Sequence, residues 1–419
     1  MKRVLFPSLV WLCGVMIAAA QLPTIEPPRG WKTAEGQAFQ ASIMSYDGVT
    51  VIFRAPNGSQ APYPAARLSA DDQAYLVEWQ KKQPIKINLP TEVGVETSEV
   101  KAEVVSEDPA AEKFVYRTQH FEFESQGKFT QSLLRDVARN FEATYELVKA
   151  LPWGILPEPD SGDRFKARLL KNREEYHNAG GPPNSGGVYM GSQSIFMVPF
   201  ESIGVKLVGK SYTKDEDFKT HTMVHELTHQ MMHGSLRYLP QWVVEGTAEY
   251  TGTLPLKTGK FRLSAVKNGL KDYLEYLKKD TRDGIPEPYS LEKLFPITNE
   301  EWNRTLEENP RASHQLYFTS YLLVYYFMHL DEKGDGQLFA RYFREIASAR
   351  DDIEKYRKGT DDAKKQAGAK RPERPAILSS PEAIADFQKK TLAILLNGRT
   401  SEELMKQIRS AYARLGVRL

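Results

Sequence analysis

The residues of this chain whose types and spacing best suit metal chemistry lie in the segment His221-Thr-Met-Val-His225-Glu226-Leu-Thr-His229. His225 and His229 are four residues apart, so on a helix their imidazoles project from one face, one turn apart. Two imidazoles in that arrangement can bind one Zn²⁺ ion. Glu226 is turned by about 100° from its neighbour, so it can act as general base on a zinc-bound water without binding the metal itself.

The next segment strengthens this interpretation, because a His-Glu-x-x-His pattern also occurs by chance on helices with two structural histidines. A catalytic zinc site needs three protein ligands and a water molecule. Glu245 can be the third ligand, on a second helix that we expect to begin near Pro240. Glu249 follows one turn later and can accept a hydrogen bond from the outer ring N–H of a ligating histidine.

Two further histidines, His221 and His233, continue the four-residue spacing on both sides of the pair. Four histidines in a column suggest a two-metal site as an alternative. No clustered carboxylates accompany them, however, as a second metal would require. We therefore expect one zinc ion per chain, with His221 and His233 as polar partners around it.

Together these segments resemble the gluzincin metallopeptidases, which carry His-Glu-x-x-His on one helix and a glutamate ligand on the next. The run from Trp242 to Tyr250, Trp-Val-Val-Glu-Gly-Thr-Ala-Glu-Tyr, is similar to the second-helix signature of that group. More narrowly, the chain resembles secreted bacterial gluzincins that are classed as a domain of unknown function. The resemblance implies a zinc peptidase with these metal ligands and this catalytic residue: His225, His229 and Glu245 as ligands, and Glu226 as the catalytic residue.

The resemblance also implies a hydroxyl donor for the oxyanion, because similar enzymes often place a tyrosine on a later helix. Tyr317 is our candidate, with Tyr321 and His314 as alternatives. The metzincin peptidases do not fit, since their pattern requires a glycine and a third histidine where this chain has Met232 and Ser235.

The substrate implied by the resemblance is a peptide or protein, and we predict an endopeptidase. Aminopeptidases with a similar site hold the free amine of the substrate with an acidic residue near the edge strand. Between Ala179 and Phe200 there is no Asp or Glu. The strand predicted at Val188–Phe196 is a candidate sheet edge for pairing with an extended substrate.

A function of another class remains as the alternative. The chain would then be a cell-surface or peptide-binding protein, with a vestigial or structural metal site. The presence of Glu226 argues against this, because a structural metal site needs no general base.

The expected fold is α+β. Residues 114–419 are predicted to form a zincin-type peptidase domain, with a small mixed sheet and helices followed by a helical half. Residues 83–113 are rich in proline and acidic side chains, and we predict a linker there with a strand or two.

Residues 28–82 are predicted to form a small separate unit. The turn signals Asp47-Gly48 and Asn57-Gly58 separate alternating runs, and Ser69 is a predicted helix cap. The unit resembles SH3-like barrels of the actin-adaptor homology type, which occur at the N-termini of secreted bacterial proteins. The resemblance implies a small all-β barrel that is structural or binds a peptide or surface ligand.

The N-terminus predicts export. Residues 1–20 begin with Lys2 and Arg3, continue without charge, and end in three alanines, as a signal peptide does. The alternative is an uncleaved N-terminal anchor. We expect a periplasmic, extracellular or cell-surface protein that has no stable membrane insertion after signal cleavage.

Composition excludes other classes. The chain has 419 residues with 56 Lys and Arg against 54 Asp and Glu, a formal net charge of +2. A basic stripe along the whole chain is thereby excluded, and we expect no nucleic-acid partner. The single cysteine, Cys13, excludes an intrachain disulfide and a cysteine-based zinc site.

Overall fold

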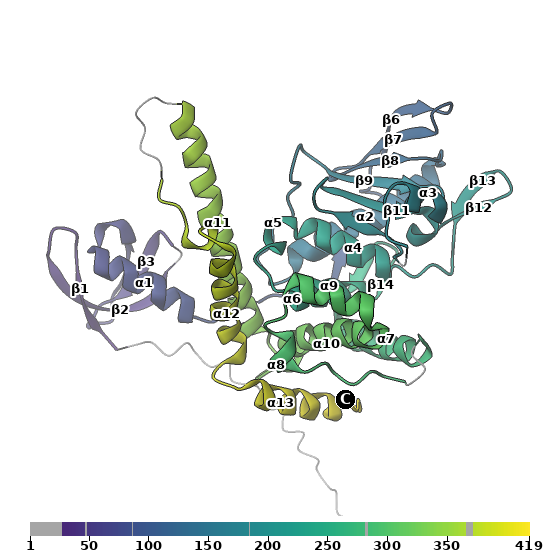
Figure 1. The fold of residues 1–419 in the computed structure, drawn as a ribbon. Helices are drawn as coiled ribbons and strands as arrows, with labels where there is room; N and C mark the ends of the chain where they lie inside the picture. The colour runs from purple at the N-terminus through teal and green to yellow at the C-terminus, as the bar shows by residue number, and fades with distance from the viewer. Residues whose placement is uncertain (1–26, 47, 86, 184, 281–283, 366–371) are drawn as a thin grey trace, which may run out of the picture. The chain divides into compact units, whose positions relative to one another are not determined.

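The computed structural model describes residues 27–419 except 47, 86, 184, 281–283 and 366–371 (Figure 1). The predicted signal peptide, residues 1–20, lies outside the described residues, and so does Cys13. The chain divides into two compact units, one ending at Pro84 and the other beginning at Ile85. Within the described part of the chain, no helix combines the length and apolar character needed to cross a membrane.

The smaller unit is an antiparallel sheet of four strands in sequence order, followed by a helix. Trp31 and Val51 are fully buried in its core, and the indole N–H of Trp31 donates to the carbonyl of Ala41 at 2.9 Å. The helix begins after Ser69, whose side chain accepts from the Asp72 N–H, as the sequence predicts. The elements are β1 (Arg29–Lys32), β2 (Ala38–Tyr46), β3 (Thr50–Arg54), β4 (Gln60–Pro64) and α1 (Ala70–Lys82).

The prediction of an all-β barrel in this unit is wrong, because none of the sheets of the described chain closes into a barrel. A single isolated bridge, between Thr33 and Leu68, joins the segments that follow β1 and β4. The apolar face of the sheet is instead covered by α1, whose Leu76 and Trp79 belong to the same buried cluster as Trp31. A helix thus buries the surface that further strands would bury in a barrel.

The larger unit is built on a six-stranded mixed sheet with the order β10-β11-β9-β8-β7-β6. The pairs β11–β9 and β8–β9 are parallel, and the other pairs are antiparallel. The strands are β6 (Glu103–Asp108), β7 (Lys113–Arg117), β8 (Phe121–Ser125), β9 (Phe165–Leu170), β10 (Val188–Met190) and β11 (Ile195–Pro199).

Two helices, α2 (Gln131–Ala150) and α4 (His221–Met231), contact this sheet and each other (Figure 1). The apolar positions of α2 follow helical spacing, so one face is buried, and Phe141 meets Phe123 of β8 edge to face at 4.9 Å. Thr130 caps α2 by accepting from the Leu133 N–H. Helix α4 contacts both α2 and the strands β10 and β11 at one edge of the sheet.

The stretch 83–113, predicted to be a linker, belongs from Ile85 onward to the larger unit. Within it, β6 is the outermost strand of the six-stranded sheet, and β5 (Glu92–Gly94) pairs with β15 (Lys260–Arg262). Every residue of β6 is exposed. An edge strand with no buried face has no alternating apolar pattern, which is why the sequence pattern there resembles a linker.

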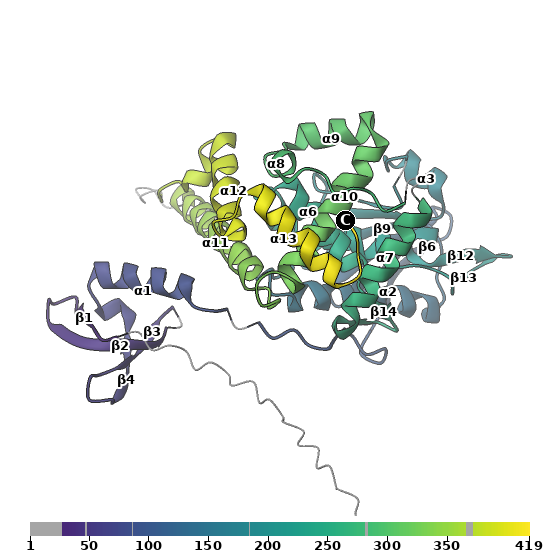
Figure 2. The same cartoon turned by 90° about the horizontal axis from the view of Figure 1, so that it is seen from below.

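The second half of the larger unit is mainly helical, with α6 (Gln241–Gly252) packed along the long buried helix α10 (Pro310–His329). At Gly246 the two backbones approach so closely that a Cβ would lie 2.4 Å from the carbonyl oxygen of Ser320. Figure 2 shows α13 (Ser401–Arg414) beside α10, where the Tyr412 hydroxyl donates to the Leu322 carbonyl at 2.9 Å. The region after Phe218 is thus largely helical, as predicted.

The larger unit contains further helices and short strands besides those described above. The helices are α3 (Arg173–Asn178), α5 (His233–Leu236), α7 (Val266–Asp280), α8 (Leu291–Leu294), α9 (Asn299–Glu308), α11 (Gln337–Lys365) and α12 (Pro381–Leu396). The strands are β12 (Val205–Val208), β13 (Ser211–Lys214) and β14 (Leu256–Lys257).

Candidate metal centre

Helices α4 and α6 carry the predicted metal ligands, and buried polar contacts fix how the two helices meet. The Thr228 hydroxyl of α4 lies 2.7 Å from the Thr251 hydroxyl of α6, and both side chains are buried. The Gln230 side-chain amide, also on α4, donates to the Lys166 carbonyl of β9 at 2.8 Å. A hydrogen bond buried between helices selects one register, because sliding either helix would leave its polar groups unpaired.

The three predicted ligands converge on one point. The Nε2 atoms of His225 and His229 are 3.0 Å apart. The Oε2 atom of Glu245 lies 3.3 Å from the first of these nitrogens and 3.5 Å from the second. A tetrahedral zinc ion with bonds of about 2.0–2.1 Å holds neighbouring ligand atoms roughly 3.3 Å apart. The spacing of the three donor atoms therefore fits one tetrahedral ion.

The protonation of the donors also fits a cation. The Nδ1 atom of His225 lies 3.2 Å from Oε1 of Glu249, which can accept the Nδ1–H and leave Nε2 to bind a metal. Oε1 of Glu245 accepts from the Gln241 side-chain amide at 2.8 Å, which leaves Oε2 for the centre. Nδ1 of His229 is buried and has no hydrogen-bond partner among the described residues. Two imidazoles and a carboxylate form a donor set that suits zinc.

The surrounding charges keep both glutamates of α6 ionised. Burial raises the pKa of the Glu245 carboxyl, but the adjacent imidazoles of His229 and His225 outweigh this and lower that pKa to about 2. Burial likewise raises the pKa of Glu249, and His221 and His225 outweigh it and hold the pKa well below its usual range. The centre therefore has two carboxylates on one helix facing the imidazoles of the other.

The predicted general base, Glu226, is held by a strand instead of by the metal-ligand cluster. Its Oε2 atom accepts from the backbone N–H of Tyr189, in β10, at 3.1 Å. Burial raises the pKa of its carboxyl, which brings a glutamate closer to the range in which it exchanges protons at neutral pH. The Glu226 carboxylate lies beside the three donor atoms without being one of them, which is the position expected for the base that deprotonates a metal-bound water.

The outer hydrogen bonds involve Glu249 and His221. Besides its contact with His225, Glu249 has its Oε2 atom 3.2 Å from Nε2 of His221. The His221 ring stacks on Tyr273 of α7, with centroids 6.2 Å apart and planes at 12°. His221 is thus a polar partner of the site, as predicted. Tyr273 was not predicted, because no local sequence signal links α7 to this helix pair.

Of the three candidates for an oxyanion donor, Tyr317 lies next to a predicted ligand. Its ring centroid is 6.4 Å from that of His225. The negative charge of Glu245, together with burial, raises its pKa, so the phenol keeps its proton and can donate it in a hydrogen bond. Tyr321 is fully buried against Tyr273, and the His314 Nδ1 atom is paired with the Pro310 carbonyl of its own helix.

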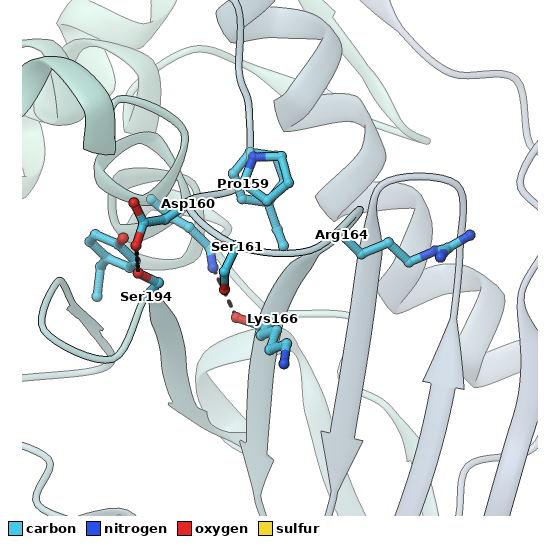
Figure 3. A pocket seen from close by; sticks show the side chains of 9 residues that line it. Pro159, Asp160, Ser161, Arg164, Lys166 and Ser194 are labelled. Atoms are coloured by element: carbon cyan, nitrogen blue, oxygen red, sulfur yellow. Dashed lines mark hydrogen bonds between the residues drawn. The ribbon is translucent and has the colours of Figure 1, made fainter. Parts of the chain in front are cut away.

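A second polar cluster lies beside β10. Figure 3 shows Asp160 and Ser194 joined by a hydrogen bond, in which the Ser194 hydroxyl donates to Oδ2 at 2.8 Å. Oδ1 of Asp160 lies 3.4 Å from Nε2 of His233, and Nδ1 of that ring lies 2.7 Å from the Tyr189 hydroxyl. The hollow beside this cluster, about 10 Å³, holds at most about one water molecule and is too small for a ligand.

Sequence reasoning missed Asp160 and Tyr189 as neighbours of the site. Asp160 lies in a loop far from either helix in sequence, and loop contacts of this kind leave no local pattern. Among the residues that the structure describes, one group of at least three His, Cys, Asp or Glu side chains is close enough to share an ion, and it consists of His225, His229 and Glu245.

The chain was compared with known proteins. No model of a known protein family matches it. No curated protein matches it either. The function is therefore inferred from the residues of the site and their geometry.

Proposed function

We propose that this protein is a secreted zinc-dependent peptidase of the gluzincin type that hydrolyses internal peptide bonds. The observation that carries the proposal is the convergence of His225 Nε2, His229 Nε2 and Glu245 Oε2 within 3.0–3.5 Å of one another. Glu226 lies beside this cluster on the same helix as the two histidines. A purely structural metal site would not need that additional, half-buried carboxylate.

The residues of the chain divide the work of the reaction. Zinc, when bound, supplies a Lewis acid for the carbonyl of the substrate and lowers the pKa of the attacking water. Glu226 accepts a proton from that water and later donates one to the leaving amine. The Tyr317 hydroxyl, which stays protonated, donates a hydrogen bond to the oxyanion. Glu249 fixes the ring of His225 through Nδ1.

The preference for internal bonds is supported by the environment of β10. Of the acidic side chains near this strand, Glu226 is the proposed general base, and Asp160 already has a partner for each of its oxygen atoms. Oδ1 faces Nε2 of His233 and Oδ2 accepts from Ser194. A carboxylate engaged in this way is poorly suited to capture the free amine of a substrate. An internal peptide should therefore bind at this site as well as a peptide with a free N-terminus.

The proposal extends to the rest of the chain. The mixed sheet with α4 and α6 would be a zincin-type peptidase domain. The signal peptide would export the protein to the periplasm, the cell surface or the medium. The N-terminal unit, with Phe39, Phe53 and Tyr63 in mutual ring contact, would be a small module that binds a peptide or a surface ligand.

The test combines elemental analysis with peptide digestion. The purified protein and its Glu226→Gln variant are assayed for zinc and for cleavage of an unbiased peptide mixture, with products identified by mass spectrometry. One zinc per chain and cleavage by the wild type alone support the proposal. Zinc with no cleavage by either protein supports the alternative of a binding protein with a vestigial site. Absence of zinc after expression in zinc-containing medium contradicts the metal centre.

A further inference from the structure

Tyr189 is held at two points by residues of the helix that carries the metal ligands and of the turn that follows it. Its backbone N–H donates to Oε2 of Glu226 at 3.1 Å. Its side-chain hydroxyl lies 2.7 Å from Nδ1 of His233. His233 begins α5, seven residues after Glu226 in the sequence. One strand residue thus connects the predicted general base with a histidine that has no place among the metal ligands.

Asp160 favours one direction for the hydrogen bond between the Tyr189 hydroxyl and His233. Nε2 of His233 faces Oδ1 of Asp160 at 3.4 Å, and this negative charge favours the tautomer with the proton on Nε2 and with Nδ1 as the acceptor. The Tyr189 hydroxyl is then the donor to Nδ1. Burial raises the pKa of Tyr189 to about 12, which keeps this hydroxyl protonated. Ser194, in the turn between β10 and β11, holds Asp160 in place (Figure 3).

Strand β10 needs such an anchor, because its own structure constrains it weakly. It has three residues, pairs with β11 on one side, and is the outermost strand of its sheet. Gly186 and Gly187 precede it and Gly191 follows it, and glycine leaves the backbone more freedom than any other residue. Sheet pairing through three residues alone would leave the Tyr189 N–H free to shift relative to α4.

We infer that Tyr189 and His233 are positioning residues for the proposed reaction. Through the Tyr189 hydroxyl, His233 holds β10 so that the Tyr189 N–H orients the Glu226 carboxylate. Without this clamp the carboxylate can rotate away from the water that it must deprotonate. The inference rests on the proposed peptidase function, and it adds two residues that neither bind the metal nor exchange protons with the substrate.

The experiment compares the kinetics of single and double variants on an N-acetylated internal peptide. Tyr189→Phe removes only the hydroxyl. We expect kcat to fall about 10–100-fold, the scale of a small misplacement of a catalytic group, with KM within threefold and one zinc retained. His233→Ala should lose as much, and the double variant should lose no more than either single variant, because both break the same clamp. His233→Asn keeps an acceptor near the Nδ1 position and should recover part of the activity.

The matched control is Tyr250→Phe, which removes another tyrosine hydroxyl that lies 2.9 Å from a histidine, Nε2 of His329. It should leave kcat near the wild-type value even if it costs the same thermal stability. Tyr189→Phe with wild-type kcat overturns the inference while the peptidase proposal stands. Additive losses in the double variant also overturn it. A zinc-loaded wild type that cleaves no peptide overturns the proposed function, and the inference with it.

Discussion

Glu249 lies between two histidines of α4, with Oε1 3.2 Å from Nδ1 of His225 and Oε2 3.2 Å from Nε2 of His221. The first contact decides which nitrogen of His225 carries the proton and which is left for a metal. The second gives the other oxygen a partner away from the centre. A residue outside the ligand set thereby controls a ligand.

Removing this carboxylate should weaken zinc binding. We expect Glu249→Ala to raise the Kd for zinc about 10–100-fold, the usual effect of losing the partner of a ligating histidine. Glu249→Gln keeps an acceptor for the Nδ1–H and should lose less. Competition with a chromogenic chelator measures both. An unchanged Kd in Glu249→Ala would show that the ring of His225 is oriented by packing alone.

Loss of the third ligand should have a larger effect. Glu245→Ala leaves two imidazoles, which hold zinc poorly, so the variant should lose its metal under dialysis conditions in which the wild type keeps one equivalent. Gln241→Ala is the graded control, because it removes only the amide that donates to Oε1 of Glu245. Elemental analysis after dialysis gives the result. Full zinc content in Glu245→Ala would remove this residue from the ligand set.

Replacing the proposed general base should reduce catalysis without reducing metal binding. Glu226→Gln keeps the shape of the side chain and an acceptor for the Tyr189 N–H, but it removes the basicity. Zinc content and thermal stability should stay near wild type, while turnover falls by at least ~10²–10⁴-fold. Loss of zinc in this variant would indicate that Glu226 is a ligand, and wild-type turnover would indicate another base.

Substrate preference tests the role assigned to Asp160. A peptide and its N-acetylated twin should be cleaved at the same internal bond with kcat/KM values within about threefold, since both carboxylate oxygens of Asp160 are already paired. Rates are compared by chromatography of the products. A strong preference for the free amine would show that Asp160 or another carboxylate binds the substrate N-terminus.

His329 predicts a specific loss of stability in acid. Burial lowers its pKa to about 4, and the Tyr250 hydroxyl lies 2.9 Å from its Nε2. The unfolded chain, with a histidine pKa near 6.5, binds the proton more readily than the folded chain. The contribution of neutral His329 to the free energy of unfolding is therefore complete above about pH 6.5. It is lost as the pH falls towards 4, with about 1–2 kcal/mol gone by pH 5.

The measurement is urea unfolding of the zinc-free protein at pH 7 and pH 5, which removes metal loss as a second cause of acid sensitivity. His329→Gln cannot titrate, so its free energy of unfolding should fall less between the two pH values than that of the wild type. An equal fall in both proteins would assign the acid sensitivity to other groups.

The candidate site shows what one sequence determines. His225 and His229 lie on one face of a helix because the spacing of four residues is a property of the helix itself. Glu245 and Glu249 follow on the next helix, so a short connection suffices to bring them opposite the histidines. The structure brings these four predicted residues together. The helical second half of the chain was likewise readable from local periodicity.

Tertiary structure alone decided the rest. Tyr189 meets Glu226, and Asp160 meets His233, across long stretches of sequence that carry no periodic signal. The barrel prediction was wrong because the residues of α1, and not further strands, cover the sheet of the smaller unit. A strand or two was expected in residues 83–113, but the sequence did not locate β6 there, because all of its side chains are exposed. Local spacing determines which side chains share a helix face, whereas packing between distant segments determines which strand, loop or helix lies opposite that face.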